Sequence, residues 1–338
     1  MNLEKIKEVL SGEAKYRFAQ VEKAIFVDLI DDWEQNTNLP KSLKEKLQVE
    51  IPLKIKTEIF GSKKSSSVKA LLELEDGEKI ETVLMRHSSG RNTVCVSSQV
   101  GCALACKFCA TGKMGFRRNL SWGEIIEQVL FFARFLKNSQ SENSRITNIV
   151  FMGMGEPFLN YENVFKAIEI LNDKNKFNIG ARHISISTAG IVEGINKFAQ
   201  EKLQINLAIS LHAPNNELRS ELMPINNKYS IEKIMSAVEK YVDKTNRQVM
   251  FEYLLIDGVN DREKDARELV QIINHPLFVV NLIRYNPVEK YRPSNPLKIQ
   301  RFKNILFKAG IRVTERYAYG QDIKAACGQL RAGQERKK

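Results

Sequence analysis

Residues Ile146–Asn172 read ITNIVFMGMGEPFLNYENVFKAIEILN, an apolar run followed by a glycine-containing turn and an amphipathic run. Ile146–Met152 is short and apolar, which indicates a buried strand. Tyr161–Asn172 carries apolar residues at helical spacing. The segment therefore predicts one strand–loop–helix unit.

The same alternation extends on both sides of this unit. Further strands are expected at Thr93–Ser97, His183–Ser187, Ile205–Leu211, Gln248–Ile256, Phe278–Ile283 and Ile311–Glu315. Further helices are expected at Trp122–Leu136, Val192–Gln200, Ile231–Val242, Asp261–Asn274 and Leu297–Ala309. Ser121 and Glu124 predict a capping box, and Ser230 an N-cap. Strands and helices that alternate at these lengths predict a parallel α/β sheet, either open or rolled into a barrel.

The first part of the chain has a different pattern. Residues 1 to about 48 predict helices, including Arg17–Trp33 and Lys41–Leu47. A β-hairpin is expected next, because Val68–Leu74 and Lys79–Met85 flank Asp76-Gly77, which is a two-residue turn signal.

The composition is that of a globular protein with excess positive charge. The 338 residues are 43% hydrophobic, and 52 Lys and Arg against 40 Asp and Glu give a net charge of +12. No apolar run is long enough to cross a membrane, and the first residues lack the apolar stretch of a signal peptide. We therefore expect a cytoplasmic protein that does not bind membranes.

Positive charge alone is weak evidence for nucleic-acid binding, since many basic proteins are simply soluble. Here the charge is clustered, in a segment from Ile51 to Ala70, directly after three closely spaced cysteines, and at the end of the chain. The residues are Lys54, Lys56, Lys63, Lys64 and Lys69, then Lys113, Arg117 and Arg118, then Arg336, Lys337 and Lys338. Such groups can neutralise the phosphates of an RNA backbone, so RNA binding is the favoured interpretation.

Three of the five cysteines lie in the segment CALACKFC, from Cys102 to Cys109. The thiolates of Cys102, Cys106 and Cys109 can converge on one metal centre. A structural zinc normally takes four protein ligands and iron–sulfur clusters normally use four cysteines, whereas this loop offers no fourth cysteine or histidine. Three ligands would leave one iron of a four-iron cluster open to a small molecule; zinc and unligated thiols are the alternatives.

Polar residues follow several predicted strands at the end where folds of this class bind ligands. Glu156 can accept a hydrogen bond from an ammonium group, and the glycines beside it let backbone approach a ligand. The residues expected at this end are Gly155, Glu156, Ser187, Ser210, Leu211, His212 and Asn286. Each polar one has a simpler interpretation as a strand-end cap or a satisfied core group. Together they offer donors and acceptors for an adenosine, a ribose and an amino acid; His183 and His275 are expected to be structural.

Two cysteines remain. Cys95 is on the first predicted strand, and taken alone it is best interpreted as a small buried hydrophobe. Cys327 lies in GQDIKAACGQL, from Gly320 to Leu330. It can reach the strand-end site if the C-terminal segment folds back.

Three motifs occur in order: VSSQVGC at Val96–Cys102, GMGEP at Gly153–Pro157 and DIKAACGQL at Asp322–Leu330. With the spacing of the three clustered cysteines, they resemble the radical S-adenosylmethionine (SAM) RNA methyltransferases of the RlmN and Cfr family over essentially the whole chain. The resemblance implies a partial (β/α)6-type radical SAM barrel in residues 88–320. It also implies an N-terminal helical accessory domain in 1–50, a basic β-hairpin extension in 51–87 and a C-terminal segment with a methyl-carrier cysteine in 321–338.

The resemblance also implies roles for individual residues. Cys102, Cys106 and Cys109 would hold one [4Fe–4S] cluster, and the seven strand-end residues would line the SAM site. Cys327 would carry the methyl group as S-methylcysteine, and Cys95 would resolve it through a transient disulfide, so all five cysteines have a role. Glu81 would be the proton acceptor, although its spacing alone predicts an exposed strand carboxylate.

The implied reaction is methylation of adenine carbon 2 in 23S rRNA and in certain tRNAs, with two SAM molecules consumed and 5′-deoxyadenosyl radical chemistry. The implied partners are these RNAs and a flavodoxin-like electron donor, and we expect a monomer. Pro157 favours this branch over the Cfr branch, which methylates carbon 8. Tyr319-Gly320-Gln321 departs from the arginine-glycine that is common in the family.

Two alternatives belong to other classes. A non-catalytic, basic RNA-binding protein with a structural metal would be colourless and would not need Cys327. A radical enzyme that acts on protein or small molecules would leave the basic N-terminal part without a purpose.

Overall fold

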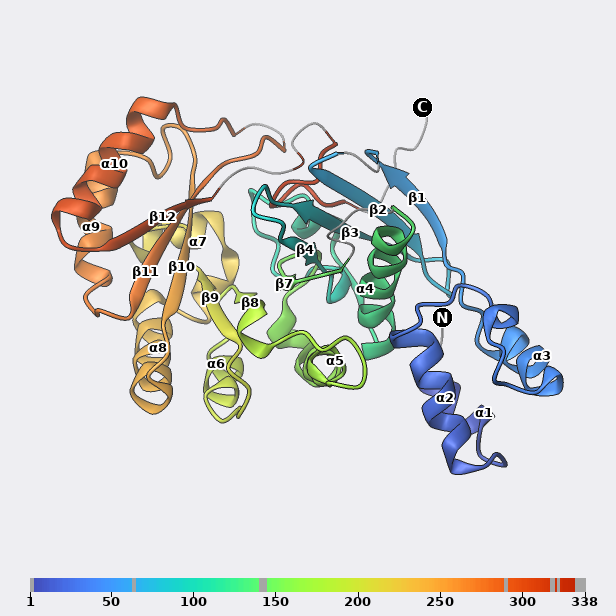
Figure 1. Ribbon diagram of the computed structural model, residues 1–338. Helices are drawn as coiled ribbons and strands as arrows, with labels where there is room; N and C mark the ends of the chain where they lie inside the picture. The colour runs from blue at the N-terminus through green and yellow to red at the C-terminus, as the bar shows by residue number, and fades with distance from the viewer. Residues whose placement is uncertain are drawn as a thin grey trace.

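The computed structural model describes residues 3–62, 65–139, 145–288, 291–316, 320 and 323–331. Within these ranges the chain forms a ten-stranded sheet in the order β1-β2-β3-β4-β7-β8-β9-β10-β11-β12 (Figure 1). The strands are β1 Lys56–Phe60, β2 Ser67–Glu73, β3 Lys79–Arg86, β4 Asn92–Cys95, β7 Asn148–Phe151, β8 Ile184–Thr188, β9 Asn206–Ser210, β10 Val249–Leu255, β11 Phe278–Arg284 and β12 Arg312–Arg316. A two-stranded sheet pairs β5 (Gln99–Gly101) with β6 (Phe116–Asn119).

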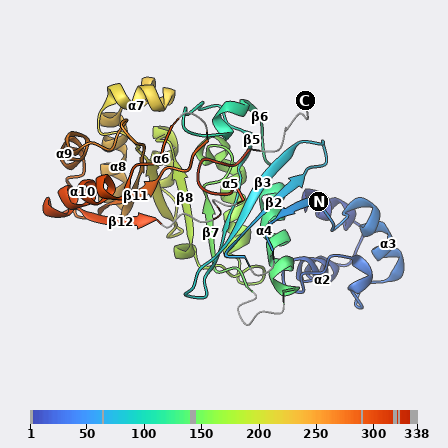
Figure 2. The same ribbon diagram turned by 90° about the horizontal axis from the view of Figure 1, so that it is seen from above.

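The seven strands from β4 to β12 in this order are parallel to their neighbours, which confirms the predicted α/β class. The sheet is curved, and helices lie along its outer side (Figure 2). They are α4 Trp122–Lys137, α5 Tyr161–Asn172, α6 Val192–Phe198, α8 Ile231–Thr245, α9 Glu263–Ile272 and α10 Pro296–Lys308. Each lies where the sequence predicts a helix, within a few residues at its ends.

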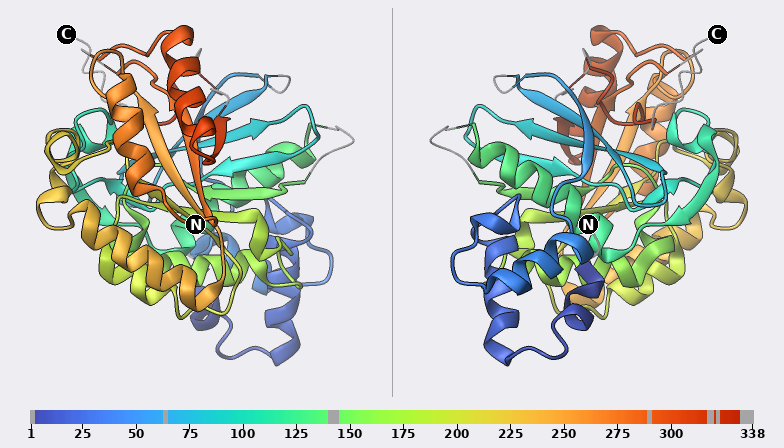
Figure 3. Two further views of the ribbon diagram at one scale, coloured as in Figure 1. Left: turned by 90° about the vertical axis from the view of Figure 1, so that its left-hand side faces the viewer. Right: turned by 90° about the vertical axis from the view of Figure 1, so that its right-hand side faces the viewer.

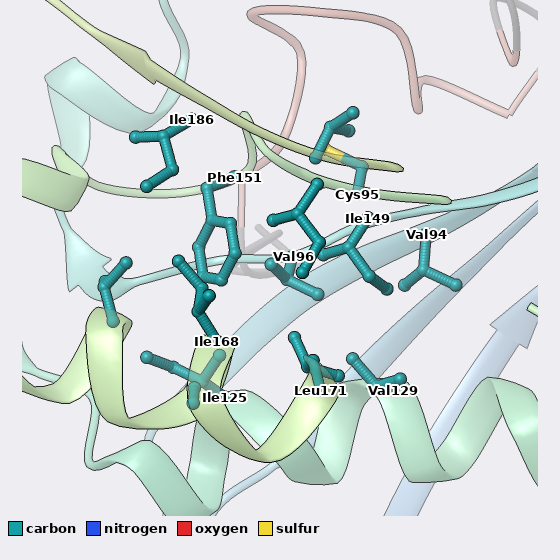
Figure 4. Packing of buried hydrophobic residues seen from close by; sticks show 14 of the residues in the cluster. Val94, Cys95, Val96, Ile125, Val129, Ile149, Phe151, Ile168, Leu171 and Ile186 are labelled. Carbon is teal, nitrogen blue, oxygen red and sulfur yellow. The ribbon is translucent and has the colours of Figure 1, made fainter. Parts of the chain in front are cut away.

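The core between β4, β7, β8 and the outer helices is made of branched and aromatic side chains (Figure 4). Val94, Val96, Ile149, Phe151 and Ile186 pack against apolar residues of α4 and α5, namely Ile125, Val129, Ile168 and Leu171. Burial of each such side chain contributes about 1.5–3 kcal/mol. Because neighbouring residues of a strand point to opposite faces, Cys95 points away from these helices, between Val94 and Val96.

The predicted hairpin is formed by β2 and β3, but its turn has three residues and not two, because the Leu74 N–H donates to the Glu78 carbonyl at 2.8 Å. Gly77, the last residue of this turn, is in the left-handed region at φ +81°. β1 pairs with β2 outside it, and β3 pairs antiparallel with β4. The hairpin is therefore part of the same sheet as the parallel strands.

Helices α1 (Ile6–Val9), α2 (Lys15–Phe26) and α3 (Lys41–Glu50) group at the β1–β3 side of the molecule, opposite α9 and α10 (Figures 1 and 3). The predicted helix Arg17–Trp33 is shorter than expected. The chain leaves helical geometry after α2, since Leu29 has φ +52°, and Trp33–Gln35 is a separate 3-10 turn.

The capping box of Ser121 and Glu124 is confirmed at the start of α4. Ser230 occupies the N-cap position of α8, but its side chain makes no capping hydrogen bond. A short helix that the sequence did not predict, α7 (Asn216–Leu222), follows β9 and is capped by Asn215.

Candidate active site

A cavity of about 160 Å³ opens at the carboxyl ends of the parallel strands. Most of the residues expected at a functional site line it, namely Cys102, Cys106, Cys109, Gly155, Glu156, Ser187, Ser210, His212 and Cys327. Met152, Glu252 and Arg316 line it as well, although no motif in the sequence marks them. Residues of the six strands from β7 to β12, together with residues of the loops that follow them and of the C-terminal segment, thus contribute to one site.

The first two sequence motifs interlock beneath the cavity. The Ser97 hydroxyl donates to the Glu81 carbonyl at 2.6 Å and accepts from the Met154 N–H at 2.9 Å. The Gln99 side chain accepts from the Glu156 N–H at 2.9 Å. Gly155 has φ +98°, and a Cβ there would lie 2.5 Å from the Gln99 Cβ. This glycine therefore permits close approach to the chain's own Gln99, in addition to facing the cavity.

The Glu156 carboxyl is buried at the base of the cavity. Its two oxygens accept from the Phe158 N–H at 3.1 Å and the Ala189 N–H at 2.8 Å. Burial raises the pKa of Glu156 to about 7 despite these hydrogen bonds. A positively charged group of a ligand would lower this pKa again and would be held by the carboxylate.

The next two strands supply hydroxyl and imidazole groups. The hydroxyls of Ser187 and Ser210 lie 3.2 Å apart. His212 has φ +58°, and its Nδ1 accepts from the Leu254 N–H at 3.1 Å while its ring packs edge-on against Phe108. Burial lowers the pKa of His212 to about 3, so the ring is neutral and packs as part of the wall.

Leu211 does not line the cavity. Its side chain is fully buried, and its N–H donates to the Glu252 carbonyl at 3.1 Å. This residue therefore fixes the strand end from inside the core.

Arg219, on the unpredicted helix α7, is fully buried and holds the strand ends together. Its guanidinium donates to the carbonyls of Ala189 at 2.7 Å, Ser210 at 3.2 Å and Leu211 at 3.2 Å. No simple sequence signal marks it, because a lone arginine in a polar segment predicts solvent exposure.

The three clustered cysteines are half-buried and face the same cavity. In the part of the chain that the structure describes, no three Cys, His, Asp or Glu side chains lie close enough together to bind a single metal ion. Burial raises the pKa of Cys102 to about 12 and raises the pKa of Cys106 well above its usual value, so a positive centre is needed to hold them as thiolates. Separate thiols around one cavity fit a multi-iron cluster better than one tetrahedral zinc.

The described C-terminal residues 323–331 fold back over the cavity. The Gly328 carbonyl accepts from the Ala110 N–H at 2.8 Å, and the Leu330 carbonyl accepts from the Thr111 hydroxyl at 2.7 Å. The Asn286 amide donates to the Cys327 carbonyl at 3.4 Å. Asn286 thus holds the C-terminal segment, and the segment places Cys327 in the cavity wall.

Cys95 lies beneath the cavity, on β4, and is buried. Its sulfur accepts a hydrogen bond from the Met152 N–H, while burial and the nearby Cys327 raise its pKa to about 12. Both cysteines are free thiols. They interact electrostatically, although one comes from the first parallel strand and the other from the C-terminal segment.

Glu81 is buried, so the exposed position that its spacing predicted is wrong. Its carboxylate pairs with the Lys69 ammonium at 2.8 Å and accepts from the Arg331 N–H at 2.8 Å. The reason is that the C-terminal segment covers this face of the hairpin. Burial raises the pKa of Glu81, and Lys69 opposes the rise.

The basic groups expected to meet RNA are in part occupied by acidic partners. Lys69 pairs with Glu81, Arg118 binds Asp76 and Glu124, and Lys56 pairs with Glu73. Lys54, Lys113 and Arg117 are exposed, although Lys54 lies 3.7 Å from the Asp32 carboxylate and Arg117 lies 3.5 Å from that of Glu78. Lys63, Lys64, Tyr319, Gln321, Asp322 and the terminal Arg336, Lys337 and Lys338 lie outside the described residues.

Comparison with known proteins gives consistent results. The model of the radical SAM superfamily matches residues 96–270. A probable dual-specificity RNA methyltransferase RlmN from Dictyoglomus thermophilum is 48% identical over 335 residues, covering 98% of this chain and 95% of that relative. A protein of the same description from Geobacillus kaustophilus is 46% identical and covers 100% of this chain and 92% of the relative.

The crystal structure of a radical SAM methyltransferase from Sphaerobacter thermophilus superposes with a TM-score of 0.93 at 43% identity, covering 98% of both chains. The expected radical SAM fold is thereby confirmed. In the described part of this chain, no helix is both long and apolar enough to span a membrane.

Proposed function

Because this chain belongs to the RlmN family of radical SAM RNA methyltransferases, we propose that it methylates carbon 2 of a specific adenosine in 23S rRNA and in a subset of tRNAs. The observation that supports this most is the position of Cys327. A C-terminal segment that is more than 200 residues away in sequence brings a free thiol into the cavity of Cys102, Cys106 and Cys109. A purely RNA-binding protein would have no use for that thiol.

The family uses a [4Fe–4S] cluster and SAM, which together supply a methyl group, an electron and the means to abstract a hydrogen atom. In our proposal Cys102, Cys106 and Cys109 hold the cluster, and two SAM molecules are consumed per methylation. Glu156 accepts a hydrogen bond from the ammonium group of SAM at the cavity base. Gly155, Ser187, Ser210 and His212 complete the binding wall, with Leu211 and Asn286 supporting it from behind.

Cys327 accepts the methyl group, because a thiolate is a competent nucleophile whereas adenine carbon 2 is not. After the transferred carbon has bonded to carbon 2, the Cys95 thiolate attacks the Cys327 sulfur: the disulfide forms, the bond from that sulfur to the transferred carbon breaks, and this carbon takes up a proton to become the methyl group. The position of Cys95 beneath the cavity supports this role. Reduction of the disulfide afterwards suits a cytoplasmic, reducing compartment.

Glu81 accepts the proton from the ring in this proposal. In the structure one of its oxygens is held by Lys69 and the other by the Arg331 N–H. To reach a substrate, the carboxylate must lose the hydrogen bond from Arg331. The C-terminal segment therefore shifts when RNA binds, and Glu81 becomes accessible.

RNA is recognised, in this proposal, by the accessory helices in 1–50 and the basic hairpin in 51–87, next to the radical SAM core in 88–320 and the C-terminal segment in 321–338. The protein acts as a monomer, and a flavodoxin-like donor supplies the electron. The exposed Lys54, Lys113 and Arg117 provide positive charge for the RNA backbone.

The test is mass spectrometry of nucleosides from 23S rRNA and from tRNA treated with the cluster-loaded protein, SAM and a reductant. We expect 2-methyladenosine in both RNAs. 8-Methyladenosine would instead place the protein in the Cfr branch. Absence of any methylated adenosine, with the cluster intact and SAM bound, would overturn the proposal.

A further inference from the structure

A row of polar side chains crosses the inner side of four neighbouring strands. In the strand register Ser210 of β9 stands beside Glu252 of β10, Glu252 beside Asn281 of β11, and Asn281 beside Thr314 of β12. The Thr314 hydroxyl donates to the Asn281 side-chain oxygen at 3.0 Å. The Asn281 amide then donates to both Glu252 oxygens, at 3.1 and 2.9 Å. The Glu252 carboxylate is thus fixed in orientation.

Arg316 extends this row into the cavity. It is the last residue of β12, and its Nη1 lies 3.9 Å from Glu252 Oε2 and 3.1 Å from the sulfur of Met152. Met152 is also the residue whose N–H bonds to the sulfur of Cys95. The carboxylate and the thioether therefore hold the guanidinium beside the strand that carries Cys95.

Arg316 is the only Lys or Arg among the described residues that line the cavity. The other ionisable groups in the wall are Glu156, Glu252, His212 and the four cysteines Cys102, Cys106, Cys109 and Cys327. His212 is neutral, since its pKa lies near 3. Among the described residues, the guanidinium of Arg316 is therefore the only fixed positive charge in the cavity wall itself, while the buried Arg219 behind the wall acts on Cys106.

Arg316 interacts electrostatically with both Cys327 and Cys95, the two cysteines that react in the proposed reaction. The guanidinium interacts with Cys327, Glu252 and Cys95, and these three groups raise the pKa of Arg316 against the opposing effect of burial. In return it lowers the pKa of Cys95, which burial and Cys327 raise.

We propose that Arg316, anchored by Glu252, is a positioning residue whose positive charge keeps the sulfur of Cys327 reactive as a nucleophile. The inference rests on the proposed function, since it gives Cys327 a methyl-accepting role. It adds a residue pair that acts through the thiol and does not itself react.

The test measures the reactivity of Cys327 directly, without RNA or SAM. The cluster-loaded protein is treated with neutral iodoacetamide or anionic iodoacetate, and the unmethylated Cys327 peptide is followed by mass spectrometry. A positive charge in the same cavity wall favours the thiolate over the thiol, so Arg316→Met should slow the alkylation of Cys327 by iodoacetamide about tenfold. Alkylation by iodoacetate should slow by a larger factor, because the variant also lacks the positive charge that attracts this anionic reagent.

Two variants make the result specific. Arg316→Lys keeps the charge and should restore most of the rate. Arg312→Met removes an exposed guanidinium from the same strand, bound to the Pro276 carbonyl at 2.7 Å, and should leave the rate unchanged.

Unchanged Cys327 alkylation in folded Arg316→Met would overturn the inference. Unchanged alkylation with loss of SAM binding would assign Arg316 to the SAM carboxylate instead. The wild-type nucleoside analysis is separate, so failure of the proposed function would show there and not in the alkylation rates.

Discussion

Lys69 and Glu81 form an ion pair inside the protein, with 2.8 Å between Nζ and Oε1 and with side chains only 9% and 4% exposed. They are diagonal neighbours on β2 and β3, since Lys69 pairs with Val83 and Glu81 with Leu71. Phe60 packs beneath the ammonium at 4.7 Å. The hairpin thus carries a charge pair that is sealed from water by the C-terminal segment.

Removal of one partner should be costly. Lys69→Met leaves the Glu81 charge buried without a counter-ion, and we expect a loss of about 3–5 kcal/mol in the free energy of unfolding. Lys69→Met combined with Glu81→Gln should regain most of this loss. Urea denaturation of the single and double variants checks it. Equal stability of Lys69→Met and wild type would mean that the pair is open to water in solution.

Cys327→Ala should abolish RNA methylation, because no sulfur remains to carry the methyl group. The variant should still take up the cluster and bind SAM, since the three cluster cysteines and the strand ends are untouched. Iron content, the visible absorption spectrum and nucleoside mass spectrometry check this. Methylated adenosine formed at the wild-type rate would exclude the carrier role.

Cys95→Ala should stop the reaction after the carrier has joined the RNA. The expected product is protein covalently attached to RNA through Cys327, seen as a slowly migrating band on a denaturing gel that ribonuclease removes. Cys95→Ala/Cys327→Ala is the matched control and should give no such band. Normal turnover of the single variant would contradict the resolving role.

The raised pKa of Glu156 predicts a pH dependence of stability. In the absence of SAM the folded state holds the Glu156 proton more tightly than the unfolded state, which has a carboxyl pKa near 4.5. The stabilisation of the folded state by protonated Glu156 is therefore fully present below pH 4.5 and is lost as the pH rises through about 7. The free energy of unfolding falls by at most about 3 kcal/mol over this range. Glu156→Gln cannot ionise, so its stability relative to wild type should rise between pH 5 and 8. A pH-independent difference would show that the carboxyl already ionises at its usual pKa.

Gly155→Ala tests the interlock of the two sequence motifs. The added Cβ meets Gln99 at 2.5 Å and the backbone has φ +98°, so the variant suffers both a clash and strain. Gly115→Ala is the control, because Gly115 has φ +72° but open space around its Cβ position. We expect about 1–3 kcal/mol for Gly115→Ala, since its φ of 72° and ψ of 174° suit glycine, and a larger loss for Gly155→Ala in urea denaturation because the clash adds to the strain. Similar losses would mean that Gln99 moves aside.

The sequence predicts the parallel strands and outer helices well, because each has a long and clear periodicity. It fails for α7 and for the pairing of β5 with β6, which are too short to show a period. Helix α2 ends early for a local reason, the left-handed Leu29, that no pattern of apolar residues reveals.

The candidate site is predicted less completely, for reasons of long-range geometry. The spacing of Glu81 indicates exposure because no local pattern shows that residues 323–331 cover the hairpin. Glu252, Asn281 and Arg316 look like ordinary polar residues on their strands. Only the register of three strands brings them together beside Cys327. The three clustered cysteines Cys102, Cys106 and Cys109 could be singled out because their spacing lies within one loop.

The pairing of β3 with β4 joins the hairpin to the strand that bears Cys95. A variant truncated to start at residue 88 would expose the edge of β4, and exposed edge strands tend to pair between molecules. The hairpin is therefore not an independent module, because its removal would break the pairing of β3 with β4. A sequence change in β3 also alters the backbone pairing that holds Cys95, so in the proposed reaction RNA recognition and thiol chemistry are coupled through one sheet.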